Sequence, residues 1–281
     1  WLSVIFLSFI AWLYVLLRRW VHPIIAGMLL LFFVATPDLF AYSYLMLYDY
    51  SNMVYFFFGF YFLQCYLLDR HQPDLLFSAF LFGVATYVRN ETRVLFGLLL
   101  PLLLFHLFRQ KVSLAQILKR AGVFIVIPAL FYGVCMYLFI RNFVPVAFDV
   151  SGQLNHDMLS VSVFFKRFWD MHVLLLFKPI GLSVYGVFIY FFMGLLFVDL
   201  IWPRNFNKES RIILYGIVVV YVGMPLLGYL FPLFDLFNTT KRGLFKVLPL
   251  MLVYMANSGL IQKLSMLITN WEQKKPGQEA L

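Results

Sequence analysis

The sequence alternates between long apolar runs and short polar stretches. Each apolar run is roughly 15–21 residues long, which is about the length a helix needs to cross the hydrocarbon core of a membrane. A chain built this way has few folds open to it, because in lipid each backbone N–H and C=O must be paired within the segment itself. We expect nine membrane-spanning helices, at 1–17, 23–36, 53–68, 75–88, 94–108, 121–140, 183–202, 211–231 and 243–261.

Composition supports a membrane protein over a soluble one. Of 281 residues, 63% are hydrophobic and only 12% are charged, about half the charged fraction of a soluble domain. The predicted fold class is therefore all-α: a polytopic integral membrane helical bundle of about nine transmembrane helices plus an interfacial helix. We expect a single transmembrane module over 1–281, with an extracytoplasmic loop at 142–182 and a cytoplasmic tail at 262–281.

The basic residues predict an orientation in the membrane. Lys and Arg are more numerous in the loops at 18–22, 69–74, 109–120 and 203–211 and in the tail than in the opposite loops, which places this first set in the cytoplasm. The C-terminus is then cytoplasmic, in the bacterial inner membrane or, alternatively, the ER membrane. Because the net charge of +9 is dispersed over these loops, we expect no nucleic-acid partner.

Three charged residues lie between two apolar runs in the stretch YVRNETRVLF, namely Arg89, Glu91 and Arg93. The topology puts them at the extracytoplasmic tip of a helical hairpin, where charges cost a few kcal/mol unless they are paired or solvated. One interpretation is a site in which Glu91 orients both arginines beside a phosphate-binding cavity. The other is a simple hairpin cap with an internal Arg–Glu pair.

Two further clusters fall on the same predicted face. Asp49, in LMLYDYSNMVYFFF, is a candidate carboxylate, or it caps a helix together with Ser51 and Asn52. In the stretch TKRGLFKVLP, Lys241 and Arg242 open the last span and Lys246 follows one turn later. Cations at a helix N-terminus favour an anion, and the alternative is that Lys241 and Arg242 extend to the membrane interface.

The external segment 142–182 contains a predicted amphipathic helix. Its aromatic residues gather on one face and its charged residues on another, as in a helix lying in the interfacial plane. This helix either braces the bundle or borders a lipid cavity with a basic pair near a phosphate. The aromatic face has Phe164, Phe165, Phe168 and Trp169, and the other has Lys166, Arg167 and Asp170. The five histidines show no ligand spacing, so we expect no metal site.

Three stretches together resemble the polytopic glycosyltransferases of the type C fold (GT-C), which include protein mannosyltransferases and lipid A aminoarabinose transferases. In ATPDLFAYSYLMLYDYSN an aspartate opens a membrane helix after a proline and an aromatic stretch. In GVATYVRNETRVLF, Arg89 and Glu91 match the family hairpin, with Asn90 in place of the usual proline. In TKRGLFKVLPLM, Arg242 and Pro249 match the closing helix.

The resemblance implies an enzyme that moves a sugar from a polyprenyl-phosphate donor to an extracytoplasmic or lumenal acceptor, which is a lipid, a glycan or a protein. Such transfer needs a carboxylate to take the acceptor's proton and cations to stabilise the departing phosphate. No cofactor is implied. The candidate catalytic residues are Asp49 and Glu91, and the candidate phosphate-binding residues are Arg89, Arg93, Lys166, Arg167, Lys241, Arg242 and Lys246.

One departure from the family concerns its main acidic residue, which lies in the first external loop after an initial membrane helix. No such helix and loop precede the 1–36 region. Either the sequence lacks an N-terminal portion, which the start at Trp1 within an apolar run favours, or the protein has lost this carboxylate and is not an active transferase. Two other classes remain open: a transporter or flippase for an anionic amphiphile, and a non-catalytic scaffold subunit.

Overall fold

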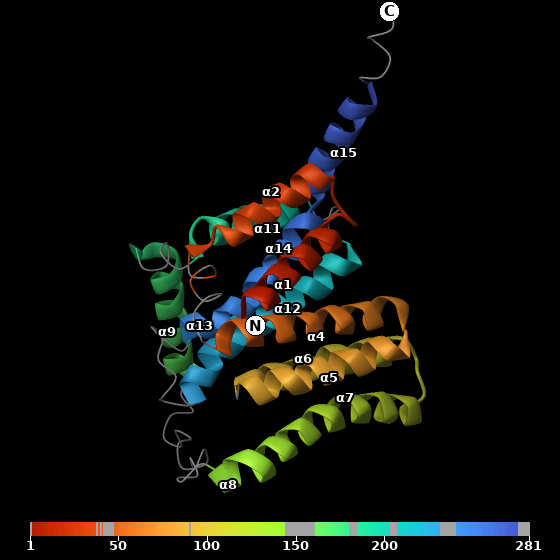
Figure 1. Ribbon diagram of the computed structural model, residues 1–281, viewed down its shortest axis with the longest axis vertical. Helices are drawn as coiled ribbons and strands as arrows, with labels where there is room; N and C mark the ends of the chain where they lie inside the picture. Colours follow the sequence, from red (N-terminus) through yellow and green to blue (C-terminus); the bar gives the residue numbers. More distant parts are fainter. Residues whose placement is uncertain are drawn as a thin grey trace, which may run out of the picture. The chain divides into compact units, whose positions relative to one another are not determined.

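The computed structural model describes residues 2–37, 39, 41, 48–89, 91–143, 161–179, 185–202, 207–230 and 240–274. Nearly all of these residues are helical, and this part of the chain contains no strand (Figure 1). The all-α prediction is therefore confirmed. The helices group into two compact units, each assembled from segments distant in sequence, and each unit is described by itself.

Unit 1 comprises 1–46, 174–215 and 248–281. Aromatic side chains pack its helices together: the rings of Phe32 and Phe188 lie 5.5 Å apart, and those of Phe192 and Tyr254 lie 5.4 Å apart. The Tyr254 hydroxyl also donates to buried Asp199 at 3.1 Å. Its helices are α1 (Leu2–Leu17), α2 (Pro23–Val34), α11 (Phe188–Ile201), the first part of α12 (Lys208–Leu230), most of α14 (Val247–Asn257) and α15 (Gly259–Lys274).

The last predicted span, 243–261, contains a break. α14 ends at Asn257, and the chain then bends by 54° into α15. α15 reaches Lys274, so the segment predicted as a cytoplasmic tail begins as a helix. Positions 275–281 lie outside the described residues.

Unit 2 comprises 47–173 and 216–247. Its centre is a set of four consecutive helices joined by short turns, in which Arg70 and Lys111 adopt positive φ to reverse the chain. These helices are α4 (Tyr48–Asp69), α5 (Gln72–Val88), α6 (Glu91–Arg109) and α7 (Leu114–Val134), followed by the π-helix η1 (Cys135–Ile140) and α8 (Arg141–Phe143). The unit also holds α9 (Val161–His172), the start of the π-helix η3 (Val173–Phe177), the second part of α12, α13 (Lys241–Gly243) and the 3₁₀ turn η6 (Leu244–Lys246).

Four phenylalanines, one from each central helix, form the core of unit 2. The Phe82 ring lies 5.5 Å from Phe56, 5.4 Å from Phe96 and 5.9 Å from Phe124. The rings of Phe96 and Phe124 are 4.7 Å apart. Tilted and edge-on arrangements are favourable for aromatic rings because of the ring quadrupole. These contacts hold the four helices together.

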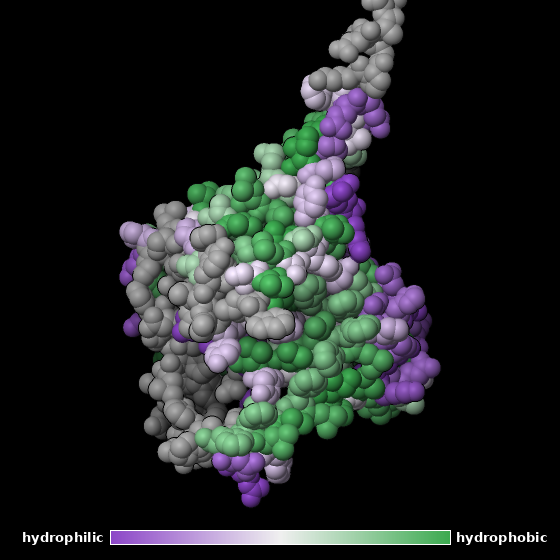
Figure 2. Space-filling view, in the orientation of Figure 1, coloured by the Kyte–Doolittle hydropathy of each residue, from purple (hydrophilic) through white to green (hydrophobic). Residues whose placement is uncertain are grey.

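The surface of α7 is apolar, which suits a lipid environment better than water. The helix is strongly apolar, yet side chains such as Ile125, Val126 and Leu130 are exposed. A hydrophobic surface of this kind covers α5 and α7 (Figure 2). Contiguous apolar surface on one long helix is unfavourable in water and favourable in lipid.

The number of spans is only partly supported. Each of the nine predicted runs coincides with a helix. Among the described residues, however, only four helices are long and apolar enough to cross a membrane, or five if α14 and α15 are counted as one bent span. The coarser statement stands: the chain is a helical protein with several helices that are compatible with a membrane.

Candidate functional site

Three segments of unit 2 meet in a cluster of charged side chains. The first turn of α4 contributes Asp49, and the turn between α5 and α6 contributes Arg89 and Glu91. Arg242 comes from α13 and Lys246 from η6, which packs against α4. The sequence predicts that all three segments lie on the extracytoplasmic face, and in the structure they contact one another.

The five side chains form a continuous chain of ion pairs. Arg242 donates from Nε to Asp49 Oδ2 at 2.9 Å, and Arg89 Nη2 lies 3.0 Å from Asp49 Oδ1. Arg89 Nε then donates to Glu91 Oε1 at 3.0 Å, and Lys246 Nζ donates to the same oxygen at 3.2 Å. Each carboxylate therefore lies between two cations.

A buried amide holds the backbone around this cluster. Asn52, one turn after Asp49, is fully buried and donates from Nδ2 to the Ala85 carbonyl of α5 at 2.7 Å. Its Oδ1 accepts from Thr92 Oγ1 of α6 at 3.1 Å. The Asn52 side chain thus links three helices at the level of the site, and it does not cap α4 as the alternative interpretation proposed.

Burial divides the cluster into an inner and an outer part. The side chains of Asp49, Glu91 and Lys246 are 1%, 4% and 2% exposed, whereas those of Arg89 and Arg242 are 20% and 27% exposed. Three cations and two anions leave a formal charge of +1. Burying a charge is costly unless it has partners of opposite charge, and each of the three inner side chains has such a partner. The net positive charge is left at the two arginines.

The chemistry open to the cluster follows from this division. Both oxygens of Asp49 contact guanidinium groups and Glu91 contacts two cations, so both carboxylates are already engaged in ion pairs. Arg89 contacts the two carboxylates through Nε and Nη2. A guanidinium has five N–H donors in a planar arrangement, which suits oxoanions. The arrangement is therefore suited to holding a phosphate, and less suited to taking a proton.

The remaining predicted site residues lie elsewhere or play other parts. The prediction that Glu91 orients both arginines describes Arg89 but not Arg93, whose guanidinium lies 3.9 Å from the centre of the Tyr132 ring on α7. Lys246 was predicted to bind phosphate, and it is instead the buried counter-ion of Glu91. The hairpin-cap interpretation predicted the Arg89–Glu91 pair correctly, but this pair is only one link of a longer chain.

Three further predicted residues belong to α13 and α9. Lys241 belongs to α13, but its side chain lies outside the described residues. Lys166 and Arg167 lie on α9, whose Phe168 and His172 rings pack against Tyr221 of α12. Phe165 and Trp169 on the same helix are exposed, and so are Lys166 and Asp170, so the interfacial interpretation stays a prediction. The roles of these basic residues stay predictions.

Sequence reasoning missed the part played by Asn52 and Tyr132. A signal for Asn52 was present, because an amide one turn after Asp49 inside an aromatic-rich helix must find buried partners. No comparable signal marked Tyr132, one of 17 tyrosines in the chain.

No known protein family matches this sequence, and neither the curated proteins nor the solved structures contain a significant match. Within the described ranges, no group of three or more His, Cys, Asp or Glu side chains could hold a metal ion.

Proposed function

We propose that the protein is a membrane glycosyltransferase that takes a sugar from a polyprenyl-phosphate donor and transfers it to an acceptor outside the cytoplasm. The observation that carries the proposal is the pair of partly exposed arginines, Arg89 and Arg242, held by the buried carboxylate of Asp49. Support also comes from the sequence, in which these residues occupy the positions that match the GT-C hairpin and closing helix.

In this proposal the two arginines bind the phosphate of the donor and stabilise the charge that develops as the sugar leaves. Asp49 and Glu91 fix the guanidinium groups before the donor arrives, so that binding needs little rearrangement. Lys246 neutralises Glu91 from the interior. This assigns phosphate recognition to the cluster and revises the role of Asp49 from acceptor activation to positioning. As the acceptor oxygen bonds to the sugar and the sugar–phosphate bond breaks, the acceptor's proton is taken by the departing polyprenyl phosphate, so the transfer balances without a carboxylate of the cluster.

Transfer in lipid nanodiscs tests the proposal. Polyprenyl phosphate released from a panel of polyprenyl-phosphate-linked sugars reports turnover whichever sugar is used. Arg242→Ala removes a charged hydrogen bond worth about 1.5–3 kcal/mol, which corresponds to a roughly 10–150-fold loss. Arg242→Lys is expected to restore part of it, because an ammonium is a point charge without the planar fork. The matched control is Arg109→Ala, an exposed arginine at the far end of α6.

Wild-type turnover in a folded Arg242→Ala variant would remove the phosphate-binding role.

One observation favours a second function, a transporter of an anionic amphiphile: the bend between α14 and α15 resembles the broken helices of many transporters. Movement of intact donor across proteoliposomes, without release of polyprenyl phosphate, would support that alternative.

A further inference from the structure

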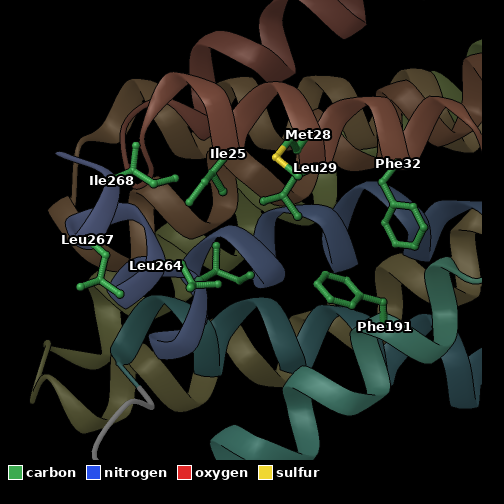
Figure 3. A pocket seen from close by; sticks show the side chains of 9 residues that line it. Ile25, Met28, Leu29, Phe32, Phe191, Leu264, Leu267 and Ile268 are labelled. Carbon is green, nitrogen blue, oxygen red and sulfur yellow. The ribbon is translucent and has the colours of Figure 1, made fainter. Parts of the chain in front are cut away.

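Unit 1 contains an apolar groove distinct from the charged cluster of unit 2. Nine side chains line it, all of them apolar, and its volume is about 610 Å³. Met28 and Leu29 of α2 form one wall, Leu264 and Leu267 of α15 form another, and Phe191 of α11 closes the far end (Figure 3). Met28 and Leu267 are largely exposed, so the groove is open to the surface beside these two side chains.

One end of the groove is polar. Ile25 and Ile268 mark this end (Figure 3), and one turn beyond them α2 and α15 are joined through His22. Its Nε2 lies 3.0 Å from Glu272 Oε2, and its backbone N–H donates to Ser265 Oγ at 2.7 Å. The groove therefore has a direction, with an apolar end at Phe191 and a polar end at His22.

The polar end carries charges of both signs. Arg18 and Arg19 are exposed in the turn before His22, and Trp20 in the same turn donates from Nε1 to Glu209 Oε2 at 3.0 Å. Glu272 is paired with His22. Trp271, exposed beside Glu272, is the kind of side chain that lies at the level of lipid head groups.

Size and energetics narrow the possible occupants. A helix about 10 Å across would fill 610 Å³ in roughly 8 Å of its length, under two turns, so the groove suits a flexible chain better. Because lipid tails are as apolar as leucine, a chain gains little by leaving the bilayer for such a groove. Selective binding must then come from the head group, and the basic residues at the polar end favour an anionic one.

We propose that this groove is a binding site for an anionic phospholipid of the surrounding membrane. One acyl chain lies along α2 and α15, and the phosphate lies at the polar end beside Arg18 and Arg19. The proposal is independent of the glycosyltransferase function, because every residue it uses belongs to unit 1 and the charged cluster belongs to unit 2.

Native mass spectrometry of the delipidated full chain tests the head-group part, with phosphatidylglycerol and phosphatidylcholine of identical acyl chains as probes. Each basic residue near the phosphate is expected to strengthen binding about fivefold. The double variant Arg18→Gln/Arg19→Gln should therefore bind phosphatidylglycerol about 30-fold more weakly, and phosphatidylcholine almost unchanged. The control Arg109→Gln/Lys111→Gln makes the same charge change in unit 2 and should behave as wild type. Equal affinity of the wild type for the two lipids would overturn the proposal.

The groove itself is tested by filling it. Leu264→Trp places an indole in the cavity, whereas Leu260→Trp makes the same change at a similarly exposed position of α15 outside the lining. Leu264→Trp should abolish the phosphatidylglycerol preference and Leu260→Trp should keep it. The same affinity in both variants would overturn the proposal. So would displacement of phosphatidylglycerol by equimolar polyprenyl phosphate, because the groove would then belong to the donor.

Discussion

The inner pair of the cluster, Glu91 and Lys246, gives the sharpest stability prediction. Lys246 Nζ is 3.2 Å from Glu91 Oε1, and both side chains are almost completely buried. Glu91→Gln keeps the size of the side chain but removes the only full negative charge that Lys246 contacts directly among the described ion pairs. Removing one partner of a buried pair costs about 3–5 kcal/mol, a large share of a total stability of about 5–15 kcal/mol.

The partner variants make the reasoning quantitative. Lys246→Met should cost less, about 1.5–3 kcal/mol, because Glu91 still pairs with Arg89 at 3.0 Å. Glu91→Gln/Lys246→Met leaves no buried charge unpaired at this link, so it should recover about 1–3 kcal/mol relative to Glu91→Gln alone. The double variant is thus expected to be more stable than one of its parents.

Unfolding free energies measured by reversible denaturation in bicelles provide the assay. The control is Glu272→Gln, whose carboxylate is 47% exposed and paired with His22, and it should stay within about 1 kcal/mol of wild type. A Glu91→Gln variant within about 0.5 kcal/mol of wild type would refute the buried-pair reasoning, and so would additive losses in the double variant.

Three further predictions concern other parts of the chain. Gly83→Ala should destabilise the protein by about 1–3 kcal/mol, since the added Cβ would lie 2.5 Å from the Phe131 ring. The Cβ added by Gly97→Ala would meet no other part of the molecule within 4 Å, so this variant should be neutral or stabilising by up to about 1 kcal/mol. Thermal unfolding of the two variants compares them. Arg93→Gln should lower stability by about 0.5–2 kcal/mol through loss of the Tyr132 contact and leave donor turnover within about twofold, and a turnover loss as large as that of Arg242→Ala would return Arg93 to the phosphate site. A cysteine at Ala115 should react with impermeant maleimide only from the cytoplasmic side, and labelling from outside would invert the topology.

The sequence predicted the helices well because their signal is local. Each of the nine predicted runs coincides with a helix among the described residues, and α4, α5 and α6 begin or end within a few residues of the expected bounds. How many of these helices span a membrane stays a prediction beyond the four or five that are long and apolar enough. The bend after Asn257 was not predicted, because the apolar residues continue from α14 into α15 and the pattern predicts one span over 243–261. A local signal was present, since Ser258 and Gly259 lie at the break and Ser–Gly pairs are typical of turns and helix kinks.

Most residues of the candidate site could be predicted from the sequence, but the ion pairs between them could not. Charges that interrupt apolar runs are costly, so Asp49, Arg89, Glu91 and Arg242 could each be singled out from the sequence. Their pairing depends on which helices are neighbours, and the Asp49–Arg242 contact joins residues 193 apart in the chain. For the same reason Lys246, which reads as a phosphate ligand, turns out to be an internal counter-ion, and Arg93 packs on an aromatic ring.

The central claim is that Arg89 and Arg242 bind the phosphate of a polyprenyl carrier. The most direct test measures the affinity of the protein in nanodiscs for polyprenyl phosphate and for the matching neutral polyprenol. We expect the phosphate to bind far more tightly, and we expect Arg89→Gln/Arg242→Gln to lose about 3–6 kcal/mol of that affinity, roughly two charged hydrogen bonds, while polyprenol binding is unchanged. Equal affinity of the wild-type protein for the phosphate and the alcohol would contradict the claim.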